Sequence, residues 1–141
     1  MNSTINKNEK PRLLVVEDDL ENQRLIEIYL KRNFRINVCD SEDTFYAQLQ
    51  KSKFDIFLVD ISLRGKKNGL ELIKELRSSE EYANSSIICV SAHVFPKDRR
   101  NAFNAGVDEF IARPVRNEDM LKCILDVYKK RTGKKIEWVN S

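Results

Sequence analysis

The stretch Phe54-Asp55-Ile56-Phe57-Leu58-Val59-Asp60 decides the fold of this 141-residue chain. It is a short run of mostly apolar, β-branched and aromatic side chains that ends in a carboxylate and is followed by Gly65 and Gly69. A run of this kind predicts a strand covered on both faces, as in a parallel sheet. Asp60 would then lie at the carboxyl end of the strand, where open α/β sheets bind ligands. Taken alone, Asp60 could equally well begin a turn.

Similar apolar runs alternate with helical patterns along the rest of the chain. The helical segments repeat apolar residues at i, i+3 and i+4, with Ser41, Pro96, Gly106 and Gly133 as start or stop signals. This alternation predicts an α/β fold, a doubly wound five-stranded parallel sheet with five helices. The predicted strands are 12–16, 36–39, 54–60, 87–91 and 108–112, and the predicted helices are 20–32, 41–51, 69–78, 97–105 and 117–132.

Composition indicates one domain without special affinity for nucleic acid or membranes. Hydrophobic residues make up 41% of the chain, and 25 Lys and Arg against 22 Asp and Glu leave a net charge of only +3. The basic residues between 129 and 135 are typical of a solvated helix end. We expect a flexible leader over residues 1–10, one domain over 11–131 and a C-terminal tail over 132–141.

The cysteines and the N-terminal residues indicate a reducing compartment. Cys39, Cys89 and Cys123 are odd in number, widely spaced and set among apolar residues, so we expect them in the core rather than in disulfides or a metal site. The polar N-terminus does not have the apolar centre of a signal peptide, and no apolar run is long enough to span a bilayer. These features predict a cytoplasmic protein.

Polar residues follow four of the predicted strands, and in a parallel sheet they would share one edge. They are Glu17 and Asp18, then Asp60, Ser91 and Arg113. Neighbouring carboxylates repel one another unless a cation lies among them. Oxygen ligands without His or Cys favour Mg²⁺, beside which an aspartate can act as a nucleophile toward a phosphoryl group. The hydroxyl of Ser91 and the cation of Arg113 would then stabilise the transferring oxygens.

From residue 12 to about residue 130 the chain resembles the receiver domain of two-component response regulators, which has a flavodoxin-like (β/α)5 fold. The resemblance depends on the order and spacing of several motifs together. These are Leu-Val-Val-Glu-Asp-Asp at 14–19, Phe-Leu-Val-Asp-Ile-Ser-Leu at 57–63 with Asn-Gly-Leu-Glu-Leu at 68–72, Val-Ser-Ala at 90–92, and Ala-Gly-Val-Asp-Glu-Phe-Ile-Ala-Arg-Pro-Val at 105–115.

The resemblance implies a Mg²⁺-dependent phosphoacceptor site. Asp60 would accept the phosphoryl group, Asp18 would bind Mg²⁺ directly, and Glu17 would be the second acidic residue, often acting through water. The backbone carbonyl of Ser62 would complete the metal site. Such a protein catalyses only its own phosphorylation and dephosphorylation, so the resemblance implies a signalling protein and not an enzyme acting on outside substrates.

The resemblance also implies a switch and its partners. A histidine kinase or histidine phosphotransfer protein would donate the phosphoryl group, and Ser91, Arg113 and Phe110 would respond to it. A downstream protein would bind the surface formed by residues 97–105, 108–112 and 117–132. No direct contact with nucleic acid or membrane is expected, and a homodimer stays open. Whether the chain acts alone or belongs to a larger protein such as a hybrid kinase is also open.

Two departures from the family pattern matter. Receivers generally carry Lys where this chain has Arg113, and the forked guanidinium is not equivalent to an ammonium at a tight site. The loop after Asp60 has no Pro at Leu63-Arg64, and Gly69 lies one position further on than usual.

Two other functions stay in consideration. One is a degenerate receiver that keeps the fold as a phosphate-independent interaction module, which Arg113 favours and the acidic residues oppose. The other is an aspartyl-phosphate phosphatase or phosphotransferase, but such enzymes usually have a second acid two residues after the nucleophile, where this chain has Ser62. His93 has no partner at metal or triad spacing, and we expect at most an influence on phosphoryl loss.

Overall fold

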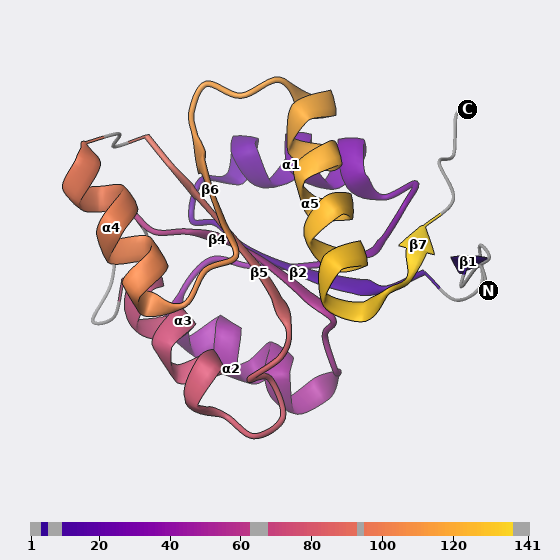
Figure 1. Cartoon of the computed structure of the whole chain (residues 1–141), viewed down its shortest axis with the longest axis horizontal. Coiled ribbons are helices and arrows are strands. Elements are labelled where there is room, and N and C mark those ends of the chain that lie inside the picture. The colour runs from indigo at the N-terminus through magenta and orange to yellow at the C-terminus, as the bar shows by residue number, and fades with distance from the viewer. Residues whose placement is uncertain (1–3, 6–9, 63–67, 93–94, 137–141) are drawn as a thin grey trace.

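The computed structural model describes residues 4–5, 10–62, 68–92 and 95–136, and within these ranges the predicted parallel sheet is confirmed. Its five parallel strands follow the order β3-β2-β4-β5-β6 (Figure 1). The strands are β2 (Arg12–Val16), β3 (Arg35–Cys39), β4 (Ile56–Asp60), β5 (Ser86–Ser91) and β6 (Glu109–Ala112).

The decisive stretch forms the centre of this sheet. All five residues of β4 are buried, and Leu58 pairs with Val15 on one side and with Ile88 on the other. A strand covered on both faces needs apolar side chains in both directions, which explains the continuous apolar run. The sheet therefore carries Asp60 at the middle of its carboxyl edge.

Helices cover both faces of the sheet (Figure 1). Residues of α1 and α5 share one apolar cluster with one sheet face, and residues of α2, α3 and α4 share a second cluster with the other. Among the described helices, none has the length and apolar character needed to cross a membrane. The helices are α1 (Leu20–Leu30), α2 (Glu42–Lys51), α3 (Gly69–Ser78), α4 (Pro96–Ala105) and α5 (Asn117–Thr132).

The two apolar clusters use alternate residues of β4. Phe57 points toward α2 and α3, where its ring meets the Tyr82 ring edge-on at 5.2 Å between centroids, while Leu58 belongs to the cluster beneath α1 and α5. Cys39 and Cys89 are core residues as predicted, and burial raises the pKa of each thiol to about 12. A thiol with so high a pKa is almost entirely protonated at neutral pH and reacts slowly.

Several predicted boundaries differ from the structure by one or two residues. Helix α1 ends at Leu30 rather than Arg32, and β4 begins at Ile56 because Phe54 and Asp55 precede the ladder. A second small sheet was not predicted: β1 (Thr4–Ile5) pairs in parallel with β7 (Lys135–Ile136). The rest of the leader, except Lys10, and the tail from residue 137 lie outside the described residues.

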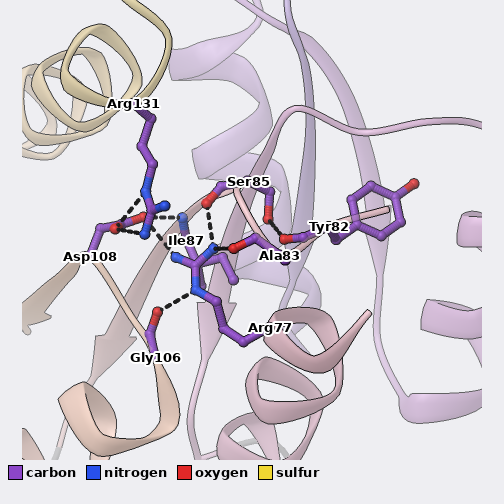
Figure 2. A network of polar contacts seen from close by, with 8 residues as sticks. All are labelled: Arg77, Tyr82, Ala83, Ser85, Ile87, Gly106, Asp108 and Arg131. Atoms are coloured by element: carbon purple, nitrogen blue, oxygen red, sulfur yellow. Dashed lines mark hydrogen bonds and ion pairs between the residues drawn. The ribbon is translucent and has the colours of Figure 1, made fainter. Parts of the chain in front are cut away.

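A polar network ties four segments together at the amino edge of the sheet (Figure 2). The guanidinium of Arg77 on α3 donates to the carbonyls of Ala83, Ser85 and Gly106 at 2.6–3.1 Å and pairs with Asp108 at 3.0 Å. Asp108 also accepts from the backbone N–H of Ile87 at 2.8 Å and pairs with Arg131 of α5. Arg77 and Asp108 side chains are only 15% and 16% exposed, so this network is shielded from solvent.

Replacing Arg77 with Ala should lower the free energy of unfolding by about 3–5 kcal/mol, because it leaves three carbonyls without their donor and removes one of the two guanidinium groups that pair with the buried Asp108 carboxylate. Urea denaturation followed by circular dichroism would measure the change. Lys122→Ala is the matched control, since it removes an exposed ion pair with Asp126 and should cost about 0–1 kcal/mol. Equal stability of the two variants would contradict a structural role for the network.

Candidate functional site

The structure brings the predicted strand-end residues together at the carboxyl edge of the sheet. Glu17 and Asp18 follow β2, Asp60 ends β4, Ser91 ends β5, and Arg113 follows β6. These strands are neighbours in the order β2-β4-β5-β6, so residues up to 96 positions apart in sequence become close in space. The carboxylates of Glu17, Asp18 and Asp60 offer oxygen atoms that all lie within 4.8 Å of one another.

The acidic pair after β2 is held by the start of α1. The backbone N–H of Glu17 donates to Cys39, extending the ladder with β3, and its carbonyl accepts from the side chain of Gln23. Asp19 caps the helix by accepting from the backbone N–H of Asn22 at 3.0 Å. Glu17 is buried, whereas the carboxylate of Asp18 beside it is exposed.

Asp60 is 5% exposed, and both of its carboxylate oxygens have partners. Oδ1 accepts from the backbone N–H of Ser62 at 2.8 Å and from the Ser62 hydroxyl at 2.5 Å. Oδ2 accepts from Nη1 of Arg113 at 3.3 Å. The carboxylate is therefore held in a fixed orientation at the end of the strand.

Arg113 bridges the two buried carboxylates. Its backbone N–H donates to the carbonyl of Ser91 at 2.9 Å, and its peptide bond to Pro114 is cis. From this position Nη2 lies 2.5 Å from Oε1 of Glu17, while Nη1 reaches Asp60. A guanidinium can hold two carboxylates at once because its donors form a planar fork.

The electrostatics of the site favour a bound cation. Glu17 is 1% exposed, and burial raises the pKa of its carboxyl group; the nearby Asp60 carboxylate acts in the same direction, whereas Arg113 opposes both. Among the described residues, oxygen atoms of three carboxylates converge here, and Arg113 pairs with two of them, Glu17 and Asp60. An all-oxygen donor set of this charge fits a hard divalent ion such as Mg²⁺.

The remaining predicted site residues are placed as follows. Ser91 is fully buried at the end of β5, and Phe110 is half-buried on β6, where it packs against the cluster beneath α2, α3 and α4. Ser62 is exposed beside Asp60. His93 lies outside the described residues, as do Leu63, Arg64 and Gly65 of the loop after β4. The role predicted for His93 stays a prediction.

The part that Gly69 plays in the site was not predicted from the sequence. Gly69 begins α3, and a Cβ atom there would lie 2.6 Å from the carbonyl oxygen of Asp60 and 2.7 Å from the Cα of Ile61. Real Cβ atoms do not approach backbone atoms so closely, so the absence of a side chain lets α3 pack against the end of β4. A glycine in the first turn of a helix, with Asn68 as cap, was the available signal.

Gly69→Ala should displace either α3 or the end of β4 and lower the free energy of unfolding by about 1–3 kcal/mol through overpacking. Chemical denaturation would measure this loss, with Glu71→Ala, an exposed change on the same helix, as the control. A variant as stable as the parent would mean that the two segments separate freely, which is inconsistent with the close packing observed.

Comparison with known families identifies relatives over most of the chain. The sequence model described as the response regulator receiver domain matches residues 13–125. The transcriptional regulatory protein ResD of Bacillus subtilis is 29% identical over 104 residues, which cover 73% of this chain and 42% of ResD. The transcriptional activator protein PfeR of Pseudomonas aeruginosa is 31% identical over 105 residues, which cover 74% of this chain and 33% of PfeR. The chain thus spans less than half of either relative.

Solved structures share the fold at lower sequence identity. A CheY-like receiver domain protein from Methanospirillum hungatei superposes with a TM-score of 0.79 at 22% identity, covering 88% of this chain and 98% of the other. The receiver domain of the sensor histidine kinase PA1611 from Pseudomonas aeruginosa, described with a magnesium ion in its active site cleft, gives a TM-score of 0.75 at 23% identity. That comparison covers 84% of this chain and 98% of the other.

Proposed function

Because the chain belongs to the response regulator receiver family, a signalling family of two-component systems, we propose that Asp60 accepts a phosphoryl group from a histidine kinase or histidine phosphotransfer protein. The observation that carries this proposal is the position of Asp60, at the carboxyl end of the central strand and within 4.8 Å of the carboxylate oxygens of Glu17 and Asp18. A solitary strand-end aspartate would not support it. The convergence of three carboxylates with Arg113 does.

The metal site of the proposal consists of the carboxylates of Glu17, Asp18 and Asp60 and the backbone carbonyl of Ser62. Their clustered carboxylate and carbonyl oxygens suit Mg²⁺, and the magnesium described in the PA1611 receiver supports the same choice. When bound, the ion would neutralise charge on the phosphoryl oxygens and on the acidic residues. The exposed carboxylate of Asp18 gives this side of the group access to solvent and to a phosphoryl donor.

Different residues of the chain have different roles in the phosphoryl transfer. An oxygen of the Asp60 carboxylate forms the new bond to phosphorus while the bond from phosphorus to the donor's imidazole nitrogen breaks, and that nitrogen keeps the electron pair. The product is an acyl phosphate on Asp60. The guanidinium of Arg113 and the hydroxyl of Ser91 then donate hydrogen bonds to phosphoryl oxygens, which stabilises charge that water would otherwise solvate.

The switch follows from the same contacts. A phosphoryl group biases two conformations only through interactions that differ between them, and Ser91 and Arg113 supply these interactions. Movement of Ser91 at the end of β5 would reach Phe110 on the neighbouring strand β6. The surface of α4, β6 and α5 would then change its affinity for a downstream protein. Direct nucleic-acid binding is not part of this proposal, and the site of action is the cytoplasm.

The rival function is a receiver that no longer uses phosphate and binds its partner constitutively. Arg113 favours this alternative, because its two ion pairs satisfy Glu17 and Asp60 without a metal or a phosphoryl group. The exposed carboxylate of Asp18 beside them favours the phosphoacceptor instead.

The parent protein should gain one phosphoryl group when incubated with acetyl phosphate and Mg²⁺, because Asp60 is the nucleophile of the proposal. Intact-mass analysis would detect the adduct, which should be absent without Mg²⁺ and absent in Asp60→Asn. Asp55→Asn is the matched control, since Asp55 lies at the opposite edge of the sheet, where it accepts from the backbone N–H of Arg12, and should not affect the adduct.

Two results would decide against this function. An adduct that persists in Asp60→Asn would place the phosphoryl group elsewhere on the chain. No adduct on the parent at any Mg²⁺ concentration, with a normal adduct on Arg113→Lys, would favour the phosphate-independent binding module.

A further inference from the structure

A cavity of about 220 Å³ lies at the amino edge of the sheet, opposite the strand-end carboxylates. Sites for drug-sized ligands typically measure roughly 300–1,000 Å³, so this cavity suits a smaller molecule. The proposed phosphoryl transfer uses none of the residues that line it. Aromatic, acidic and hydroxyl side chains are combined in its walls, among them Phe54, Asp55, Glu81, Tyr82, Ser86 and Tyr128.

A buried hydroxyl without a partner forms part of the cavity wall. Ser86 begins β5 and is 1% exposed, yet its hydroxyl makes no hydrogen bond with the described residues. Side chains alternate along the strand: Ile87 belongs to the cluster beneath α2, α3 and α4, and Ile88 to the cluster beneath α1 and α5. Ser86 therefore faces α5, where Tyr128 lines the same cavity. Because an unpaired buried hydroxyl costs free energy, a ligand that hydrogen-bonds to Ser86 would recover that cost.

Asp55 supplies a carboxylate in a fixed position at the rim of the cavity. Its backbone N–H donates to the carbonyl of Arg12 at 2.9 Å, and its carbonyl accepts from the backbone N–H of Ser86 at 3.2 Å, so the residue is tied to β2 and to β5. Oδ2 of Asp55 accepts from the backbone N–H of Arg12 at 2.9 Å. A carboxylate can accept about four hydrogen bonds, so most of this capacity is left for a ligand.

The lining combines negative charge with aromatic surface. Asp55 and Glu81 are acidic, and none of the described residues that line the cavity is Lys or Arg. Lys53 pairs with Glu81 at 3.5 Å, but both side chains are exposed and such a pair contributes little. Burial raises the pKa of the Tyr82 and Tyr128 hydroxyls, and the Asp55 carboxylate acts in the same direction, so both rings stay neutral. Neutral aromatic rings beside carboxylates favour a cation.

We propose that this cavity binds a small organic cation, namely a primary ammonium group on a short aromatic or aliphatic body. An ammonium group has three donors and no acceptor, which matches the carboxylate of Asp55 and the hydroxyl of Ser86. The apolar body would lie against the rings of Phe54 and Tyr128. The inference goes beyond the phosphoacceptor function and does not depend on it, because the two sites lie at opposite edges of the sheet.

Titration of the whole chain with benzylamine, followed by ¹H–¹⁵N correlation spectra at about pH 7 and about 0.15 M salt, would test the proposal. Benzylamine is a cation under these conditions, and benzyl alcohol is a neutral molecule of the same size. Benzylamine should shift the backbone N–H signals of Asp55, Ser86 and Tyr128, with a dissociation constant on the order of 1 mM. Benzyl alcohol should bind at least about tenfold more weakly, because it has no charge for Asp55 to pair with.

Three variants locate the binding. Asp55→Asn should weaken benzylamine binding on the order of tenfold, because the amide still accepts from Arg12 but has no charge. Ser86→Ala should weaken it about fivefold through loss of one hydrogen bond. Asp126→Asn is the matched control and should bind like the parent, since Asp126 is exposed on α5 and pairs with Lys122 outside the cavity. The melting temperature of each variant without ligand checks its folding.

The opposite outcomes would overturn the inference. If benzylamine causes no saturable shifts, the cavity holds only water. Equal affinities for benzylamine and benzyl alcohol would exclude selection for a cation, and unchanged affinity in Asp55→Asn would place the ligand elsewhere. Asp55→Asn should still form the Mg²⁺-dependent phosphoryl adduct, so failure of this inference is distinguishable from failure of the proposed function.

Discussion

Two carboxylates buried at one edge of a parallel sheet impose the constraint on which the rest of the site depends. Glu17 and Asp60 are almost fully shielded from water, yet they lie close enough to repel each other. Burial of unpaired charge costs several kcal/mol, on the order of half the stability of a small domain. A cation must therefore be present, and the chain supplies one in Arg113.

The two edges of the sheet meet the same requirement in different ways. At the amino edge Asp108 accepts hydrogen bonds from Arg77, from Arg131 and from a backbone N–H (Figure 2). Arg77 donates its other hydrogen bonds to backbone carbonyl groups. Such a network fixes the start of β6 against α3 and α5. At the carboxyl edge three carboxylates converge, and the carboxylate of Asp18 is exposed. The amino edge thus holds a carboxylate shielded from solvent, whereas the carboxyl edge presents an acidic group to solvent.

The sequence was sufficient to predict the sheet, because a strand buried on both faces requires a continuous apolar run that few other structures produce. It was also sufficient to predict that Asp60 and Glu17 lie at the same edge, since parallel strands have their carboxyl ends on one side of the sheet. It did not reveal the bridge from Arg113 to Glu17, because the reach of a side chain across two strands depends on the packed backbone. The carbonyl partners of Arg77 could not be predicted from the sequence either, since every residue type has a backbone carbonyl group. The paired segments β1 and β7 are too short to show a periodicity.

One side chain satisfies two buried carboxylates at the carboxyl edge of the sheet. A guanidinium can do this because its donors form a planar fork, so Nη2 contacts Glu17 while Nη1 reaches Asp60. An ammonium group is a compact charge on a shorter stem and does not offer the same pair of donors. The bridge lowers the free energy of the protein without a bound cation, and an interaction of this kind weakens ligand binding only to the extent that it is lost when the ligand binds. The part of the Arg113 bridge that is kept in the bound state therefore decides how the stability of this edge and its affinity for a cation are related.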